Sequence, residues 1–495
     1  MKKIIITGVL SAIVIIVGLS FIEIDNSDEG VINNSIVYAV NAIPNELKDV
    51  SKLSTRDEDI ICATSKGLVS KDNEGKIVPA LSEEIKVKDD GIEYEFKIRD
   101  DVYWSDGQKI TAEDIRDFFR ELLKEEGDDN ISAFLNVYGA KEFRDGKVTF
   151  EKGVAIKASE NTLSIRLNKK DDKFLDELTK TQYRVRKYLI MWDDLINNYK
   201  RIVYSGEYKI NNITKEGIEL IKNSNSKESS AGKINIVSDE NEELSMASFE
   251  VGDRDVVVNP PSNQLNRLDS EGRLKTFNSD GGMYVSLNAN EDKLPLSSRR
   301  TLYFKLNVAM GDYQEENSNA LELAEGSYFR EDKDNLDKLQ SRKVMTSSSE
   351  GKLPEVITIL GIDNNYNRSV VKHLEKWFEE NSKSKVRYSL VKEEEYKNLE
   401  LRKRYDVILI DEIANPKDKE GFYSSLKSHY TEKEVALYDS IDKSNDKNFN
   451  KLEEQLFNNY SIVPLTFENK NVAISKEINN IEFDFYGNIK FETLK

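Results

Sequence analysis

Apolar and polar residues alternate with a period of two in the first third of the chain. Apolar residues occupy alternate positions between residues 85 and 98, on either side of the turn Asp89-Asp90-Gly91. A second pair of such runs covers residues 154–156 and 163–167. Strands that bury one face show this alternation, so each pair of runs predicts a β-hairpin.

Between the two hairpins the period changes to that of a helix. Thr111 and Asp114 have the spacing of a capping box, in which each side chain bonds the other residue's backbone N–H. The apolar residues that follow recur on one helical face: Ile115, Phe118, Phe119, Leu122 and Leu123. We therefore expect a helix after Thr111, and an α+β arrangement for this part of the chain.

The C-terminal half contains short, continuous apolar runs separated by helical patterns. The expected strands and helices alternate at residues 356–360, 370–378, 386–390, 393–404 and 407–410. This βαβαβ order predicts a mostly parallel sheet. A similar helix-then-strand unit at residues 246–258 indicates a second α/β lobe. We interpret the polar stretch from Gly311 to Gly351 as a surface excursion with some helix.

The N-terminus has the pattern of a membrane segment. Lys2 and Lys3 precede an uncharged stretch from Ile4 to Ile22, which places the rest of the chain outside the cytoplasm. At about 1.5 Å per residue this stretch just spans a bilayer core of about 30 Å. Bulky residues occupy the usual cleavage position, and no Cys lies nearby to accept a lipid. Residues 1–22 therefore predict a signal anchor or an uncleaved signal peptide, followed by a tether at residues 23–36.

Composition and charge exclude several classes of function. The 495 residues carry a net charge of -18, which repels nucleic acid. Only His373, His429 and Cys62 could supply imidazole or thiolate groups, so Cys/His metal sites are disfavoured. We find no phosphate-binding loop, zinc-protease or nucleophile-elbow motif. Paired carboxylates lie in charged, solvated stretches. The sequence thus predicts neither an enzyme nor a cofactor or metal site.

One segment is more informative: residues 100–114 read DDVYWSDGQKITAED. Asp106-Gly107 supplies a tight turn, and Trp104 is expected to pack beneath it. The run resembles the motif W-[ST]-D-G-x-x-[VIL]-T-A-x-D-[VIL] of the family 5 extracellular solute-binding proteins, which serve ABC importers of peptides, oligopeptides and nickel. Similar elements lie before and after it, in the family's order, at residues 67–69, 77–83, 204–210, 249–256, 288–300, 405–407 and 464–465. In the element at residues 204–210, Glu207 replaces a Pro of the family pattern.

The resemblance implies an α/β fold with two lobes. This is the periplasmic-binding-protein-like fold of class II, in its large oligopeptide-binding type, with an extra α+β subdomain in the first lobe. The implied division assigns residues 37–70, 190–282 and 465–495 to lobe I, residues 71–189 to the subdomain, and residues 283–464 to lobe II.

The resemblance also implies a function. The chain would be the extracytoplasmic component of an ABC importer, held at the outer face of the cell membrane by its N-terminal segment. It would act as a monomer that captures a peptide or another small solute between the lobes and delivers it to the permease subunits. The alternative is a membrane-anchored sensor or interaction protein that kept the fold with altered or lost ligand binding.

Two segments map onto the family's ligand-pairing strands. The first includes Leu53, Thr55 and Asp57; the second includes Asp411, Glu412, Ile413 and Asn415. In peptide binders a Gly-Trp pair precedes an Asp that holds the ligand's α-ammonium group, but here Glu412 replaces the Trp and Asn415 replaces the Asp. A neutral amide holds an ammonium group less strongly than a carboxylate does. Asp411 or Glu412 is therefore the expected substitute anchor.

Overall fold

The computed structural model describes residues 35–494, apart from residues 41, 73, 89–90, 226–230, 240, 331–350, 417–418 and 444–445. The predicted signal anchor and almost all of the predicted tether lie outside the described residues, as do two residues of the first predicted turn. Among the residues described, no helix combines the length and apolar character needed to cross a bilayer. Residues 36–495 form one compact unit.

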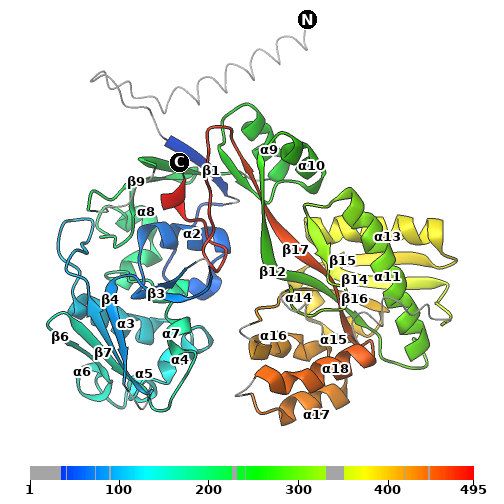
Figure 1. Cartoon of the computed structure of the whole chain (residues 1–495), viewed down its shortest axis with the longest axis horizontal. Helices are drawn as coiled ribbons and strands as arrows, with labels where there is room; N and C mark the ends of the chain where they lie inside the picture. Colours follow the sequence, from blue (N-terminus) through cyan, green and yellow to red (C-terminus); the bar gives the residue numbers. More distant parts are fainter. Residues whose placement is uncertain are drawn as a thin grey trace, which may run out of the picture. The chain divides into compact units, whose positions relative to one another are not determined.

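A mixed sheet of 11 strands is built around two long antiparallel strands, β12 (Leu274–Leu287) and β17 (Ile462–Ile474). They pair with each other along most of their length and join the two halves of the sheet (Figure 1). One half carries β11 (Val256–Val258), β1 (Ser35–Val40), β10 (Lys233–Ser238), β9 (Gly217–Lys222) and β8 (Tyr208–Ile213). The other half carries β16 (Val407–Ile413), β14 (Val356–Ile362) and β15 (Lys385–Val391). We call these halves, with their helices, the first lobe and the second lobe.

The second lobe confirms the predicted βαβαβ series, because β14 pairs in parallel with both β15 and β16. Its helices are α11 (Leu296–Glu316), α13 (Asn365–Asn381), α14 (Glu393–Tyr396), α15 (Leu399–Arg402), α16 (Lys419–Ser425), α17 (Glu432–Ser440) and α18 (Asn450–Asn458). A short strand, β13 (Leu321–Leu323), pairs with β17.

The interpretation of residues 311–351 as a surface excursion with some helix is correct about the helix but wrong about the surface position of residues 321–329. Helix α11 continues to Glu316, and Leu321, Tyr328 and Phe329 are buried in the core of the second lobe. These apolar residues are too widely spaced to give a periodic signal, yet each fills a gap in the core. Residues 331–350 lie outside the described residues.

The first lobe contains a second, four-stranded sheet in the order β4-β5-β7-β6. Its strands are β4 (Ser82–Val87), β5 (Glu93–Ile98), β7 (Thr162–Arg166) and β6 (Ile156–Ser159), which confirms both predicted hairpins. Helix α3 (Ala112–Glu125) starts directly after its N-cap Thr111, and the predicted capping box of Thr111 and Asp114 is present. Trp104 is fully buried, and its Nε1 donates to Asp114 Oδ2 at 3.1 Å. The W-S-D-G motif is therefore structural.

The remaining elements of the first lobe are short. They are α2 (Thr55–Thr64), β2 (Val69–Lys71), β3 (Ile77–Pro79), α4 (Ser132–Leu135), α5 (Ala140–Arg144), α6 (Phe150–Gly153), α7 (Phe174–Glu177) and α8 (Leu195–Asn198). Helices α9 (Glu242–Glu250) and α10 (Ser262–Ser270) flank β11, and α9 with β11 confirms the predicted helix-then-strand unit.

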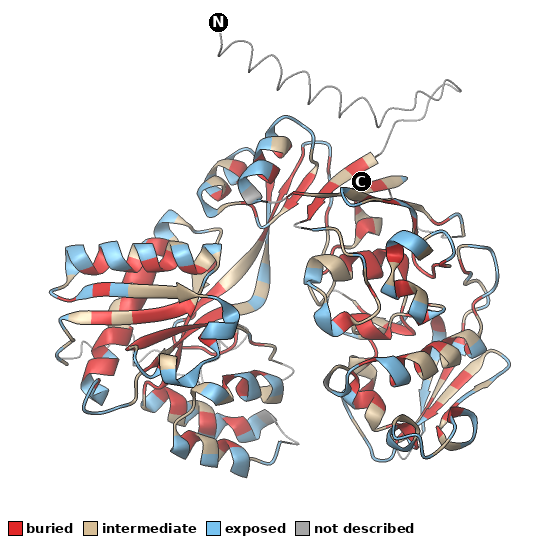
Figure 2. Ribbon diagram, turned by 180° about the vertical axis from the view of Figure 1, so that it is seen from behind, coloured by how far each residue is buried: buried red, intermediate tan, exposed pale blue. Residues whose placement is uncertain are grey.

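Buried side chains form separate clusters in the two lobes and in the α+β subdomain (Figure 2). The largest lies in the second lobe around β14, β16 and α11, and a second fills the space between α3 and the four-stranded sheet. A third lies beneath the first-lobe half of the large sheet, and a small fourth joins α9, α10 and β11. The residue boundaries of the predicted domains stay a prediction.

Candidate functional site

Three neighbouring strands bring acidic side chains together where the lobes join. In the sheet, Met283 of β12 lies opposite Asp411 of β16 on one side and opposite Thr466 of β17 on the other. Residues directly opposite each other point to the same face, and side chains alternate along a strand. Asp411, Thr466 and Glu468 therefore share one face of the sheet, and Glu412 points to the other.

Asp411 is held in place by the start of helix α13. Asn364 and Asn367 both donate from Nδ2 to Asp411 Oδ2, at 3.1 Å and 2.8 Å. Asn364 is also the N-cap of the helix, because its Oδ1 accepts from Asn367 N at 2.7 Å. The other carboxylate oxygen of Asp411, Oδ1, is buried without a hydrogen-bond partner among the described residues. Burial raises the pKa of Asp411, and the two amide donors offset this only in part.

Glu468 belongs to β17 and lies beside Asp411 of β16. Its burial, together with the negative charge of Asp411, raises its pKa to about 7. The backbone of β12 leaves room for it: a Cβ on Gly281 would lie 3.7 Å from Glu468 Oε2. Among the residues that the structure describes, none of the groups that shift the pKa values of Asp411 and Glu468 is a cation. The pair is a half-buried, like-charge arrangement, and a positive group placed between them would be stabilised.

The other predicted residues of the second segment are neighbours of Asp411 in the sequence but do not join the pair. On the opposite face, burial raises the pKa of Glu412, and a hydrogen bond with the Ser425 side chain partly offsets the effect. Ile413, the last residue of β16, is 70% exposed, and Asn415 is half-buried. Of the two substitutes expected for the family's ammonium anchor, Asp411 is the one that lies with Glu468.

The first predicted segment lies at the start of helix α2, in the first lobe. Leu53 is half-buried and packs against the first-lobe core, and Thr55 is exposed. The carboxylate of Asp57 accepts from Ser54 N at 3.0 Å and from Ser54 Oγ at 2.7 Å, which completes a capping box. Asp57 therefore has a structural task, and a ligand role for this segment stays a prediction.

A paired network lies next to this segment. Asp59 is fully buried and accepts from Tyr38 OH and from Ile489 N, each at 2.8 Å. Arg56 lies 3.2 Å from the same carboxylate. Arg56 and Lys470 both donate to the Gly487 carbonyl at 2.8 Å. Burial raises the pKa of Asp59 to about 6, which Arg56 opposes, and burial lowers the pKa of Lys470 to about 8.

The two histidines take part in local packing. His373 Nε2 lies 2.8 Å from the Ala309 carbonyl oxygen. His429 contacts Arg402, and burial with that positive neighbour lowers its pKa to about 3. Within the part of the chain that is described, no group of three or more His, Cys, Asp or Glu side chains could hold a metal ion.

Sequence reasoning missed Glu468, Asn364 and Asn367. Glu468 follows an apolar run that reads as a core strand, and its only local signal is a charge directly after that run. Asn364 had the signature of an N-cap, which satisfies a helix terminus and gives no hint of a second bond to Asp411.

Similarity to known proteins agrees with this architecture. Residues 76–301 match the model of the bacterial extracellular solute-binding proteins, family 5, in its middle region. The oligopeptide-binding protein AmiA of Streptococcus pneumoniae is 27% identical over 177 residues, which is 32% of this chain and 26% of that protein. OppA of Bacillus subtilis is 26% identical over 242 residues, or 46% of this chain and 42% of OppA. The matched part thus spans about a quarter of AmiA and less than half of OppA.

Solved structures cover nearly the whole chain. The Escherichia coli murein tripeptide binding protein MppA superimposes with a TM-score of 0.64 at 17% identity, covering 93% of this chain and 98% of that one. NikA from Brucella suis, in complex with Fe(III)-EDTA, gives a TM-score of 0.68 at 15% identity, with 93% and 99% coverage.

The fold is that of the two-lobed solute-binding proteins with a large sheet and an added α+β subdomain, as predicted. The matches to the family 5 model and to the oligopeptide-binding proteins confirm the resemblance to the family 5 extracellular solute-binding proteins that is seen in the motifs of the chain. That family consists of extracytoplasmic binding proteins rather than enzymes.

Proposed function

We propose that the protein is the solute-binding component of an ABC importer and captures a peptide or a similar small solute with a free ammonium group. The observation that carries this proposal is the Asp411–Glu468 pair, two half-buried carboxylates on one sheet face where β16 and β17 flank β12. An ammonium group between them would relieve their repulsion and would form charge-assisted hydrogen bonds. Asp411 thereby takes the place of the family's anchoring Asp, which is Asn415 here.

The backbone around the pair suits an extended ligand. Residues 410–415 include the end of strand β16, whose last residue, Ile413, is exposed. The first predicted segment, residues 53–57, lies at the start of helix α2 in the other lobe. Main-chain pairing on both sides would hold a peptide with tolerance for its side chains. Leu53, Thr55 and Asp57 would then contribute through their backbone, since the Asp57 carboxylate already caps α2.

A thermal-shift titration of the full chain with a tetrapeptide pool tests the proposal. A ligand that binds only the folded state raises the melting temperature according to RT ln(1 + [L]/Kd). The shift should be absent with the same pool after N-terminal acetylation. It should also grow from about pH 5 to about pH 8, because the proton that occupies Glu468 below its pKa of about 7 competes with the ammonium group. The lack of any shift, together with no peptide in native mass spectra of the purified protein, would overturn the proposal.

The membrane attachment belongs to the same proposal. The apolar stretch at residues 4–22, preceded by two lysines, would hold the protein at the extracytoplasmic face as a signal anchor. Mass spectrometry of the protein from its own cell envelope tests this, because a signal anchor keeps residues 1–22 on the mature chain. A mature N-terminus near residue 23 would refute it.

A second candidate is a membrane-anchored sensor or interaction protein that kept the fold. Asn415, which occupies the position of the family's ammonium anchor, favours it. A gene deletion that leaves peptide uptake unchanged but alters an envelope or signalling phenotype would support this candidate over the importer.

A further inference from the structure

An open groove of about 350 Å³ lies in the first lobe, between the end of helix α8 and the strand β8. The residues of its apolar floor are Ile202, Val203, Tyr204 and Ile210. Three cations line it: Lys200 and Arg201, which are exposed, and Lys209, which is half-buried. Asp106 is the single acid among its described lining residues. The groove is therefore positive, although the chain as a whole carries a net charge of -18.

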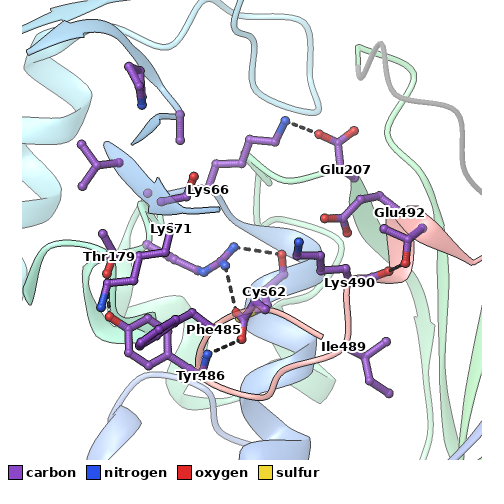
Figure 3. A pocket seen from close by; sticks show the side chains of 18 residues that line it. Cys62, Lys66, Lys71, Thr179, Glu207, Phe485, Tyr486, Ile489, Lys490 and Glu492 are labelled. Carbon is purple, nitrogen blue, oxygen red and sulfur yellow. Dashed lines mark hydrogen bonds and ion pairs between the residues drawn. The ribbon is translucent and has the colours of Figure 1, made fainter. Parts of the chain in front are cut away.

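The cations of this groove differ from those of a cavity of about 400 Å³ in the same lobe, which Figure 3 shows. In that cavity Lys66 forms an ion pair with Glu207, and its other lysines are paired as well. The three cations of the groove, by contrast, form no ion pair with any residue that the structure describes. Lys200 Nζ lies 5.6 Å from the centre of the Tyr199 ring. A group of unpaired cations on an acidic protein indicates an anionic partner.

The groove lies at the end of the sheet where the described chain begins. The neighbouring strands β1 and β10 end together, because Asp239 N donates to the carbonyl of Val40 at 2.8 Å. Their first residues, Ser35 and Lys233, therefore lie at one end of the sheet. Lys233 is in one row with Lys209 through the register of β9. Three strand spacings of about 4.8 Å put β8 about 14 Å from β1.

The length of chain before Ser35 suggests what covers the groove. Residues 23–34 separate Ser35 from the predicted membrane segment and span at most about 40 Å when fully extended. In an anchored chain, the end of the sheet that holds the groove would stay within that distance of the bilayer. Anionic lipid headgroups carry the charge that complements the groove, and each Lys or Arg near such a surface is attracted to it. Apolar side chains beside cations are also typical of surfaces that lie in the membrane interface.

We propose that this groove docks onto an anionic lipid surface, with Lys200, Arg201 and Lys209 against the lipid phosphates. Docking fixes the orientation of the first lobe on the bilayer, which a tether alone does not. The inference goes beyond solute binding and rests on the proposed membrane attachment. It involves neither the Asp411–Glu468 pair nor any residue of the second lobe.

Hydrogen exchange of the full chain in lipid nanodiscs tests the proposal. One set of discs contains phosphatidylcholine alone, and the other contains equal parts of phosphatidylcholine and the anionic phosphatidylglycerol. Exchange in residues 199–211 should be about tenfold slower in the anionic discs at low salt, because three cations hold the groove at the surface. The difference should vanish at about 1 M salt, where charges are screened beyond about 3 Å. Exchange in the second lobe should be equal in both kinds of disc.

Charge-reversal variants provide the matched control. Lys200→Glu/Arg201→Glu/Lys209→Glu should remove the lipid-dependent protection. The control variant, Lys372→Glu/Lys376→Glu/Lys383→Glu, makes the same change of charge at exposed lysines of the second lobe and should keep the protection.

A third variant removes the charges of the groove without adding repulsion. Lys200→Gln/Arg201→Gln/Lys209→Gln should lose the protection as well. Because the altered side chains lie at the surface, the melting temperatures of all three variants should stay close to that of the wild type. Loss of protection then reports on docking and not on folding.

The outcomes separate the docking groove from the membrane anchor. A chain that stays in both kinds of disc without lipid-dependent protection has the anchor and no docking groove, which overturns the proposal. A chain that binds only the anionic discs, with the groove protected, supports docking and refutes the anchor. Binding to neither kind refutes both. The proposal also fails if the charge-reversed groove keeps its protection, if the second-lobe control loses it, or if soluble polyphosphate protects the groove and anionic discs do not.

Discussion

Buried charge is balanced by bonded partners in the Asp59 network of the first lobe but not in the Asp411–Glu468 pair. In the first lobe, the Asp59 carboxylate lies with Arg56, Tyr38 OH and a backbone N–H, so its charge is balanced and its oxygens are bonded. Where the lobes join, Asp411 and Glu468 lie side by side, and only amide groups among the described residues donate to Asp411. A satisfied network stabilises the fold by itself, whereas a like-charge pair raises its free energy until a cation binds. This contrast supports a structural role for the Asp59 network and the proposed ligand role for the Asp411–Glu468 pair.

The largest expected effect comes from breaking the paired network. Asp59→Ala should lower the free energy of unfolding by about 3–5 kcal/mol, because it leaves Arg56 partly buried without its carboxylate and removes two hydrogen bonds. Urea unfolding of the full chain measures this. Asp411→Ala is the matched control, and we expect a much smaller loss from it. Equal losses of stability in the two variants would contradict the distinction between the balanced network and the like-charge pair.

A binding measurement tests the proposed ligand role of the Asp411–Glu468 pair. Asp411→Asn keeps the size of the side chain and removes its charge, so the affinity for a peptide with a free N-terminus should fall by about 10- to 100-fold, or about 1.5–3 kcal/mol. Fluorescence titration with a labelled tetrapeptide gives the change in Kd. Asp57→Asn changes a carboxylate that caps α2, and the affinity should stay near the wild-type value; a larger loss there than in Asp411→Asn would contradict the assignment.

The like-charge pair should also make stability depend on pH. The pKa of Glu468 rises from 4.5 to about 7 on folding, so between these values the folded protein keeps a proton that the unfolded chain releases. Stability due to this group therefore falls as the pH rises through that window. Glu468→Gln removes the loss and should stabilise the unliganded protein by about 1–3 kcal/mol at pH 8, with no gain at pH 4. Thermal unfolding at both pH values measures the difference. A destabilised variant at pH 8 would show that Glu468 has a cationic partner.

The smallest effect concerns the helix that positions Asp411. Asn364→Ala removes both the N-cap of α13 and one donor to Asp411, and should cost about 1 kcal/mol of stability. Asn364→Asp restores the cap but places a third carboxylate beside the pair, so its deficit should be smaller at low pH than at neutral pH. Chemical unfolding at the two pH values compares the variants. A deficit that is the same at both would mean that Asn364 acts on the helix alone.

The sequence predicted the local structure well because its signals are local. The alternation at residues 85–98 gave the hairpin of β4 and β5, and the spacing of Thr111 and Asp114 gave the first turn of α3. The same reasoning failed within residues 311–351, where buried residues such as Leu321 and Phe329 follow no period. Core positions in irregular segments are set by the shape of the space around them, which a single sequence does not express.

Some features of the candidate site likewise follow from the sequence, and others only from the tertiary structure. The sequence by itself determined the family motif around Trp104, the order of the elements, and the exchange of the expected anchor for Asn415 next to Asp411 and Glu412. Only the tertiary structure decided which carboxylate forms a pair with Glu468. Strand β12 pairs with both β16 and β17 and so aligns Asp411 with Thr466, and Glu468 lies two residues further along β17. Strand register and cavity shape arise from contacts between segments far apart in the chain, and periodicity or spacing within one segment carries no information about them.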